Sequence, residues 1–243
     1  MSYTVNASIL LTDRPVDERP QAVADAGFTR AEFWWPFQTP TPSDVEIEAF
    51  VSALDDAGVQ LTGLNFYAGD MPGGERGVLS QESRSEEFRA NIDPVLKIAR
   101  ATGCKAFNAL YGNRVDGENP AAQDRLAVEN LRRAADAVAA VDGVVLVEPV
   151  SGTEAYPLKT AADALSVIAK VDRDNVKLLA DFYHLAANGD DVARVVEEHA
   201  ADFGHIQIAD HPGRNEPGTG DLPLEQWINR SEELGYQGVI GLE

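Results

Sequence analysis

The sequence predicts a single-domain (β/α)8 TIM barrel that spans residues 1–243. Three observations lead to this fold class. Eight strand-like apolar runs alternate with seven helical patterns, which indicates parallel βαβ units. No linker-like or low-complexity stretch divides the chain, and no glycine-rich phosphate turn follows the first predicted strand. An open doubly wound sheet has the same alternation, but eight strands in about 250 residues favour the barrel.

The predicted strands and helices alternate regularly along the chain. The strand-like runs cover residues 5–11, 31–35, 61–67, 106–111, 144–149, 176–182, 205–209 and 238–243. The helical patterns cover residues 20–26, 43–57, 82–102, 120–141, 160–171, 190–201 and 224–234. Ser43 and Asn119 are typical N-caps, and Gly58 and Gly103 are typical helix ends. Because the sequence stops at the eighth strand, we expect the eighth helix to be missing or incomplete in this chain.

The composition limits the partners of the chain. Its net charge of −20 argues against nucleic acid and anionic membranes. No apolar run is long enough to span a membrane and no signal peptide is present, so we expect a cytoplasmic protein. Cys104 is the only cysteine, which excludes an internal disulfide. The expected partners are a small-molecule substrate and, in a homo-oligomer, further copies of this chain.

The stretch 204–220 combines a buried strand with a long polar loop. Ile206 and Ile208 alternate with polar or small residues, as in a strand. The proline and glycine that follow are too dense for a strand or a helix, so they predict a loop with fixed turns. In a barrel, the loops after the strands carry the chemistry. A surface connector is the alternative interpretation of this segment alone.

Oxygen-bearing side chains stand at the carboxyl ends of four consecutive predicted strands. They are Glu148, Asp181, Gln207 and Glu243. A carboxylate behind apolar residues is costly to bury unless it is paired. An arginine partner or a helix cap would explain one such residue, but less readily four on one rim. Ligands with oxygen donors favour a hard divalent cation, Mg²⁺ or Mn²⁺.

Two histidines lie close to these residues in the sequence. His184 comes three residues after Asp181, so we expect it to contact the substrate or to lie beside the metal ligands. A structural histidine at a strand end is the alternative. His205 lies two positions before Gln207 on the same strand face, and we expect it deeper in the barrel.

Three further residues are predicted to bind the substrate. Arg214 lies in the Pro-Gly loop and can supply the local positive charge that an acidic substrate needs in so anionic a protein. A salt bridge within the loop, to Glu216 or Asp210, is the alternative. Asn65 and Asn108, in the third and fourth predicted strands, complete the expected substrate site.

Several motifs of the chain form a recognisable set. They are Glu148-Pro149, DFYH at 181–184, GHIQIAD at 204–210, PGRNEPGTG at 212–220, and NFYAGD at 65–70 followed by GERG at 74–77. Together they resemble the hydroxypyruvate isomerase family of the xylose-isomerase-like TIM barrels, nearly from end to end. The resemblance implies that a divalent metal is held by Glu148, Asp181, Gln207 and Glu243. It also implies that Glu148 and Glu243 are the proton donor and acceptor.

Some positions depart from the family's pattern. His211 stands where asparagine is common, Val-Ser-Gly follows Pro149 in place of Ile-Asn, and Ala180 precedes Asp181 where a polar residue is frequent. Gln207 separates the chain from the related ketose 3-epimerases, which usually have histidine there. These positions would border the substrate, so they affect its identity more than the type of reaction.

The implied reaction interconverts hydroxypyruvate and tartronate semialdehyde through an enediolate. A metal can stabilise the negative charge of the enediolate, while two carboxyl groups exchange protons as base and acid. An isomerase or epimerase of sugars or sugar acids, with the same metal site, is the alternative. A phosphodiester hydrolase and a non-catalytic binding barrel are other classes. The charge of −20 and the shortage of histidine ligands argue against the hydrolase.

Overall fold

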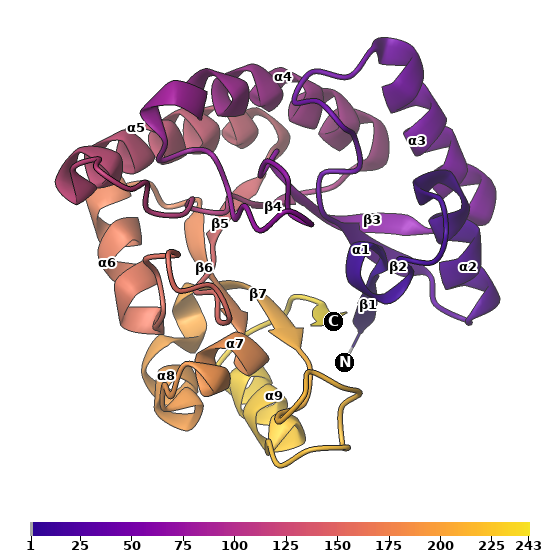
Figure 1. Cartoon of the computed structure of the whole chain (residues 1–243). Helices are drawn as coiled ribbons and strands as arrows, with labels where there is room; N and C mark the ends of the chain where they lie inside the picture. The colour runs from indigo at the N-terminus through magenta and orange to yellow at the C-terminus, as the bar shows by residue number, and fades with distance from the viewer. Residues whose placement is uncertain (1) are drawn as a thin grey trace.

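Eight parallel strands pair in sequence order and the last pairs with the first, so the sheet closes into a barrel (Figure 1). The computed structural model describes residues 2–243. At the closure, Tyr3 lies opposite Ile240 and Val5 lies opposite Leu242. The strands are β1 (Tyr3–Asn6), β2 (Arg30–Phe33), β3 (Gln60–Asn65), β4 (Ala106–Asn108), β5 (Val144–Val147), β6 (Val176–Asp181), β7 (Phe203–Ile208) and β8 (Ile240–Leu242). The predicted barrel is confirmed, and the open sheet is excluded.

Helices connect the strands and surround the barrel. The α-helices are α1 (Ala7–Leu10), α2 (Arg19–Asp25), α3 (Asp44–Ala57), α4 (Ser85–Thr102), α5 (Pro120–Val138), α6 (Ala161–Val171), α7 (Phe182–Ala187), α8 (Val192–His199) and α9 (Leu224–Glu233). Short 3₁₀ helices are η1 (Val16–Glu18), η2 (Glu82–Arg84), η3 (Ala139–Val141) and η4 (Ala200–Asp202). Only Glu243 follows β8, so residues 2–243 contain no eighth barrel helix. None of the helices described here is long and apolar enough to cross a membrane.

The predicted helix ends are confirmed at several positions. Ser43 and Asn119 cap α3 and α5 by accepting hydrogen bonds from backbone N–H groups of the first turn. Gly58 and Gly103 end α3 and α4 with φ angles of 65° and 75°, in the left-handed region that glycine adopts without strain.

All eight predicted strands run past the end of the observed strand, by one to five residues. In the first and the sixth, a polar side chain starts a short helix at that point. The predicted first strand is wrong after Asn6, because Asn6 Oδ1 accepts a hydrogen bond from the Ser8 N–H at 3.1 Å and caps α1. The sixth strand ends at Asp181, whose Oδ1 accepts from the His184 N–H at 3.0 Å and caps α7. Helices of one or two turns are too short to show an apolar period of 3.6 residues.

Alternate residues of the strands face the helices and the barrel interior. In β2, the Phe33 ring packs edge-on against Phe50 of α3, with ring centroids 5.2 Å apart. Glu32, one position earlier, is buried in the interior instead. Thr4 and Thr62 also meet there, with their hydroxyl oxygens 2.7 Å apart. The interior of the barrel is therefore partly polar.

Candidate active site

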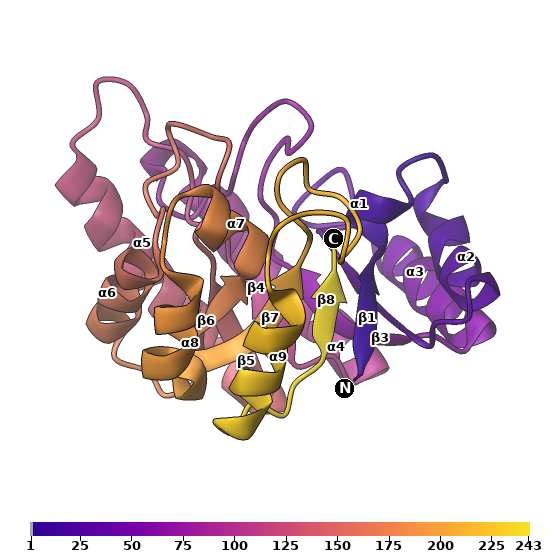
Figure 2. The ribbon, with the colours of Figure 1, turned by 90° about the horizontal axis from the view of Figure 1, so that it is seen from below.

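A cavity opens among the loops that follow the carboxyl ends of the strands. This end of the barrel is the upper one in Figure 2. Of the residues predicted for the site, the lining includes Asn65, Asn108, Glu148, His184, Gln207, Arg214 and Glu243. Asp181 is not part of the lining and is only 1% exposed. The lining also includes residues that were not predicted, namely Ile9, Trp34, Met71, Arg76, Leu110, Val150 and Ser151.

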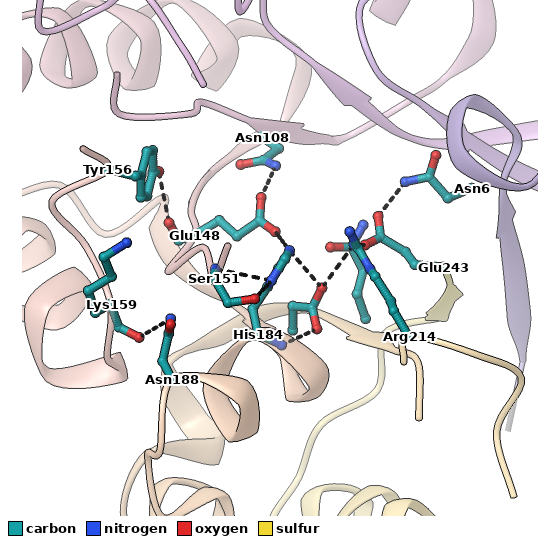
Figure 3. Close-up of polar contacts among 12 residues, drawn as sticks. Asn6, Asn108, Glu148, Ser151, Tyr156, Lys159, His184, Asn188, Arg214 and Glu243 are labelled. Carbon is teal, nitrogen blue, oxygen red and sulfur yellow. Dashed lines mark hydrogen bonds and ion pairs between the residues drawn. The ribbon is translucent and has the colours of Figure 1, made fainter. Parts of the chain in front are cut away.

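Glu148 follows β5 directly and is buried at the cavity wall. Its Oε2 accepts a hydrogen bond from Asn108 Nδ2 at 2.7 Å. The Tyr156 hydroxyl donates to the backbone carbonyl of Glu148 at 2.9 Å and fixes the end of the strand (Figure 3). Burial, and then the nearby charge of Asp181, raise the pKa of Glu148 to about 8 against the opposing effect of the Asn108 hydrogen bond.

Glu243 follows β8 and faces the same cavity. Its Oε1 accepts a hydrogen bond from Asn6 Nδ2 at 2.5 Å, and its Oε2 pairs with Arg214 Nη2 at 2.5 Å (Figure 3). Burial raises the pKa of Glu243 well above its usual value, and Asp181 adds to this effect while Arg214 opposes it. Asn6 was not predicted for the site, because it was placed within a longer first strand.

Arg214 reaches the site from the loop between β7 and α9. Besides Glu243, its Nη2 lies 3.8 Å from Asp181 Oδ2, and its guanidinium carbon lies 5.3 Å from the centre of the Tyr183 ring. Burial lowers the pKa of Arg214, but the surrounding carboxylates, Glu243 first, outweigh burial and raise it. Arg214 thus pairs with carboxylates of the site and not, as the alternative had it, with those of its own loop.

Asp210 stabilises the loop between β7 and α9 and does not pair with Arg214. Its Oδ1 accepts hydrogen bonds from the backbone N–H groups of His211 at 2.9 Å and Leu222 at 3.1 Å. Its Oδ2 accepts from the Gly218 N–H at 2.8 Å. Within the loop that these bonds close, Arg214 has a φ of 55°, in the left-handed region. The hydrogen bonds of Asp210 therefore fix the backbone that carries Arg214.

His184 points its ring into the site from the first turn of α7 (Figure 3). Its Nδ1 accepts a hydrogen bond from the Ser151 backbone N–H at 3.1 Å, and the Ser151 hydroxyl lies 2.7 Å away. Burial lowers the pKa of His184, against the opposing charge of Asp181, so the ring is neutral near pH 7. With Nδ1 accepting, a neutral ring has its hydrogen on Nε2.

This tautomer decides what His184 can do. Its Nε2 lies 3.6 Å from Asp181 Oδ2 and 3.9 Å from Glu148 Oε1. These three residues also offer ligand atoms within 4.8 Å of one another. A cation on Nε2 would require the hydrogen to move to Nδ1, where it would oppose the Ser151 N–H. His184 is therefore suited to donate a hydrogen bond into the site.

Two of the four predicted metal ligands have a buried oxygen with no hydrogen-bond donor among the described residues. These oxygens are Asp181 Oδ2 and Gln207 Oε1. Buried acceptors are almost always satisfied. Two unsatisfied oxygens beside the carboxyl groups of Glu148 and Glu243 therefore indicate that a positively charged group binds here. Carboxylate and amide oxygens are the donors that a hard divalent cation prefers. The residues present thus fit the predicted kind of metal.

Comparison with known proteins agrees with the fold. The model of the xylose isomerase-like TIM barrels matches residues 20–243. The chain is 53% identical over 249 residues to a putative hydroxypyruvate isomerase of Streptomyces coelicolor, covering 99% of this chain and 89% of that protein. It is 31% identical over 245 residues to the hydroxypyruvate isomerase of Escherichia coli, covering 100% and 93%. A crystal structure described as AP endonuclease, family 2, from Brucella melitensis matches with a TM-score of 0.89 and 31% identity, covering 100% and 92%.

The closed barrel and its buried acidic site define a xylose isomerase-like TIM barrel. Within that class, the chain belongs to the hydroxypyruvate isomerase family. It is an isomerase that moves a carbonyl group between neighbouring carbons. The predicted class of enzyme is confirmed.

The raised pKa of Glu148 predicts how the stability of the metal-free protein depends on pH. Between the ordinary value of 4.5 and about 8, the folded protein keeps a proton that the unfolded chain releases. The folded state therefore binds more protons, and its stability should fall as pH rises through this window. We expect the melting temperature in chelator to fall more steeply for the wild type than for Glu148→Gln, which cannot titrate.

Added Mn²⁺ should raise the melting temperature of the wild type more near pH 8 than near pH 5.5, because a cation favours the ionised carboxylates. Calorimetry at several pH values, with and without chelator, makes both comparisons. Parallel pH profiles for wild type and Glu148→Gln would contradict the protonated state of buried Glu148.

Proposed function

We propose that this isomerase interconverts hydroxypyruvate and tartronate semialdehyde. The observation that carries the proposal is that two buried acids, Glu148 and Glu243, face one cavity from strands β5 and β8. These strands lie three positions apart around the barrel, so the acids approach a small substrate from different sides. Similarity over the whole chain to hydroxypyruvate isomerases supports the choice of substrate.

We propose that one divalent cation, Mg²⁺ or Mn²⁺, is held by Glu148, Asp181, Gln207 and Glu243. The unsatisfied oxygens of Asp181 and Gln207 support this set, and the donor tautomer of His184 argues against its membership. When bound, the cation supplies Lewis-acid stabilisation of the negative charge that develops on the substrate. With the cation bound, one of Glu148 and Glu243 is ionised and acts as the base, while the other keeps the proton that it donates.

The chemistry assigned to the side chains is proton transfer between two neighbouring carbons. One of the two glutamates removes a proton from C3 of hydroxypyruvate, which leaves an enediolate across C2 and C3. The other returns a proton to C2, while the hydroxyl proton of O3 is transferred to O2, and tartronate semialdehyde results. His184 Nε2–H donates a hydrogen bond to a substrate oxygen that gains charge during this exchange.

The remaining predicted residues are assigned to the substrate. Arg214 pairs with the substrate carboxylate. To do so it gives up its ion pair with Glu243. Asn108 holds Glu148 through Nδ2, and its Oδ1, which has no partner among the described residues, accepts from a substrate hydroxyl. Asn65 lines the cavity beside it and contacts the same end of the substrate.

A sugar or sugar-acid isomerase or epimerase is the second candidate, and one feature of the cavity favours it. Trp34 and Met71 line both the cavity and an adjoining groove, which Trp35, Phe37 and Tyr67 also line. Aromatic walls of this kind suit the apolar faces of a longer sugar chain. The two candidates differ in the length and charge of the substrate, and both use the same acid pair.

Replacement of either catalytic glutamate tests the acid pair. Glu148→Gln and Glu243→Gln keep the shape of the side chain but cannot exchange protons. Each should lower kcat by about 10²–10⁴-fold when assayed at saturating Mn²⁺, so that weaker metal binding does not account for the loss. Glu216→Gln, which removes an exposed carboxylate of the same rim, is the matched control and should leave kcat unchanged. Activity within a few-fold of wild type in either site variant removes that residue from the pair.

The substrate is tested by kinetics of the wild type and Arg214→Ala. If the substrate is a short 2-oxo acid, Arg214→Ala should raise KM for hydroxypyruvate more than it lowers kcat, because a contact with the ground-state carboxylate is lost. Arg214→Lys keeps the charge and should lose less. Fructose and xylulose should be poor substrates.

The reaction in deuterated water, followed by NMR, should place solvent deuterium on a carbon of the product. Efficient turnover of neutral ketoses without turnover of hydroxypyruvate would replace the proposed substrate with the second candidate.

A further inference from the structure

A buried carboxylate lies beneath the proposed metal site and has no part in the chemistry described so far. Glu32 of β2 is 3% exposed. Its Oε1 accepts hydrogen bonds from Gln207 Nε2 at 2.5 Å and from Asn6 Nδ2 at 3.4 Å. Its Oε2 lies 2.6 Å from His205 Nε2. Glu32 therefore joins three strands of the barrel interior at the level just below the cavity.

The neighbouring strands leave room for this contact. From β2, the Glu32 side chain reaches β7 past β1 and β8. At Gly241 of β8, a Cβ atom would lie 2.8 Å from Glu32 Oε1 and 2.8 Å from Gln207 Cγ, closer than real Cβ atoms come. At Gly63 of β3, a Cβ atom would lie 3.1 Å from Glu32 Cβ. The two glycines flank the carboxylate, and a side chain at Gly241 would separate it from Gln207.

The contact determines which end of the Gln207 amide faces Glu32. An amide has one acceptor oxygen and one donor NH₂ group of nearly the same shape, so the side chain fits either way round. Two acceptor oxygens at 2.5 Å would repel each other, so the NH₂ group must face Glu32. Gln207 Oε1 is then the free end, and it is one of the buried oxygens of the site that have no donor among the described residues.

We propose that Glu32 is a positioning residue, which fixes the amide of Gln207 so that its oxygen faces the metal site. A cation binds the oxygen of an amide and is repelled by its NH₂ hydrogens. Without Glu32, the amide can rotate and present NH₂ to the cation. His205 holds the other carboxylate oxygen and so keeps Glu32 aimed at Gln207. The inference rests on the proposed function in one respect, namely that Gln207 is a metal ligand.

Two matched variants separate the hydrogen bond from the volume of the side chain. Glu32→Met keeps an unbranched chain of similar length but offers no strong acceptor. Glu32→Gln keeps an acceptor oxygen for Gln207 and can turn its NH₂ group toward His205. Mn²⁺ affinity, measured from the electron paramagnetic resonance signal of free Mn²⁺, should fall about 10–100-fold in Glu32→Met. In Glu32→Gln it should stay within a few-fold of wild type.

A double-mutant cycle distinguishes positioning from general support of the barrel. In a Gln207→Ala background the amide is gone, so Glu32→Met should cause no further loss of Mn²⁺ affinity. An equal loss in both backgrounds, or wild-type affinity in Glu32→Met, overturns the proposal. If Gln207→Ala itself binds Mn²⁺ as wild type does, the proposed metal site fails and not only the role of Glu32.

Melting temperatures of the metal-free variants show whether Glu32→Met folds. If it does not, Gly241→Ala takes its place, because the added methyl group meets both Glu32 and Gln207 and separates them while both residues remain. The expected and the contradicting results are the same as for Glu32→Met.

Discussion

Mutual repulsion among buried carboxyl groups is the constraint on which the rest of this site depends. Glu148, Asp181 and Glu243 stand on three of four consecutive strands of a closed barrel, largely out of contact with water. Their negative charge is costly to bury without compensation. Arg214 lies beside Asp181 and Glu243, and in the absence of a cation burial raises the pKa values of Glu148 and Glu243, which favours their uncharged forms. A divalent cation would reduce the repulsion among these groups, and the proposed chemistry uses one of the two glutamates ionised, as base, and the other protonated, as acid.

Around the site, the same residues stabilise the local fold with one side-chain atom and take part in the site with another. Asn6 caps α1 through Oδ1 and donates to Glu243 through Nδ2. Asp181 caps α7 through Oδ1 and leaves Oδ2 without a donor. The helix that Asp181 starts sets the position of His184, whose tautomer is fixed by a backbone N–H. Substitutions at these positions would therefore change the folding of the rim together with the site.

The fold and the polar half of the cavity lining were predictable from the sequence, because polar residues at the ends of apolar strands must meet on one rim of a barrel. Glu148, Gln207 and Glu243 face one cavity for this reason, whereas their roles stay predictions. The sequence also indicates that Glu32 is unusual, because it is a charged residue between Ala31 and Phe33 in a buried strand. Its partner at Gln207 could not be read from the sequence, since the contact depends on the barrel's closure and on a glycine in β8. The Ser151 contact is made partly by a backbone N–H, which no residue type reveals.

The central claim is that four oxygen-bearing side chains hold the cation and that His184 does not. An anomalous difference map from crystals soaked in Mn²⁺ tests this most directly. We predict one peak about 2.0–2.3 Å from oxygens of Glu148, Asp181, Gln207 and Glu243, with His184 Nε2 beyond coordination distance. A peak bonded to His184 Nε2 together with Glu148 and Asp181, and away from Gln207 and Glu243, would contradict it.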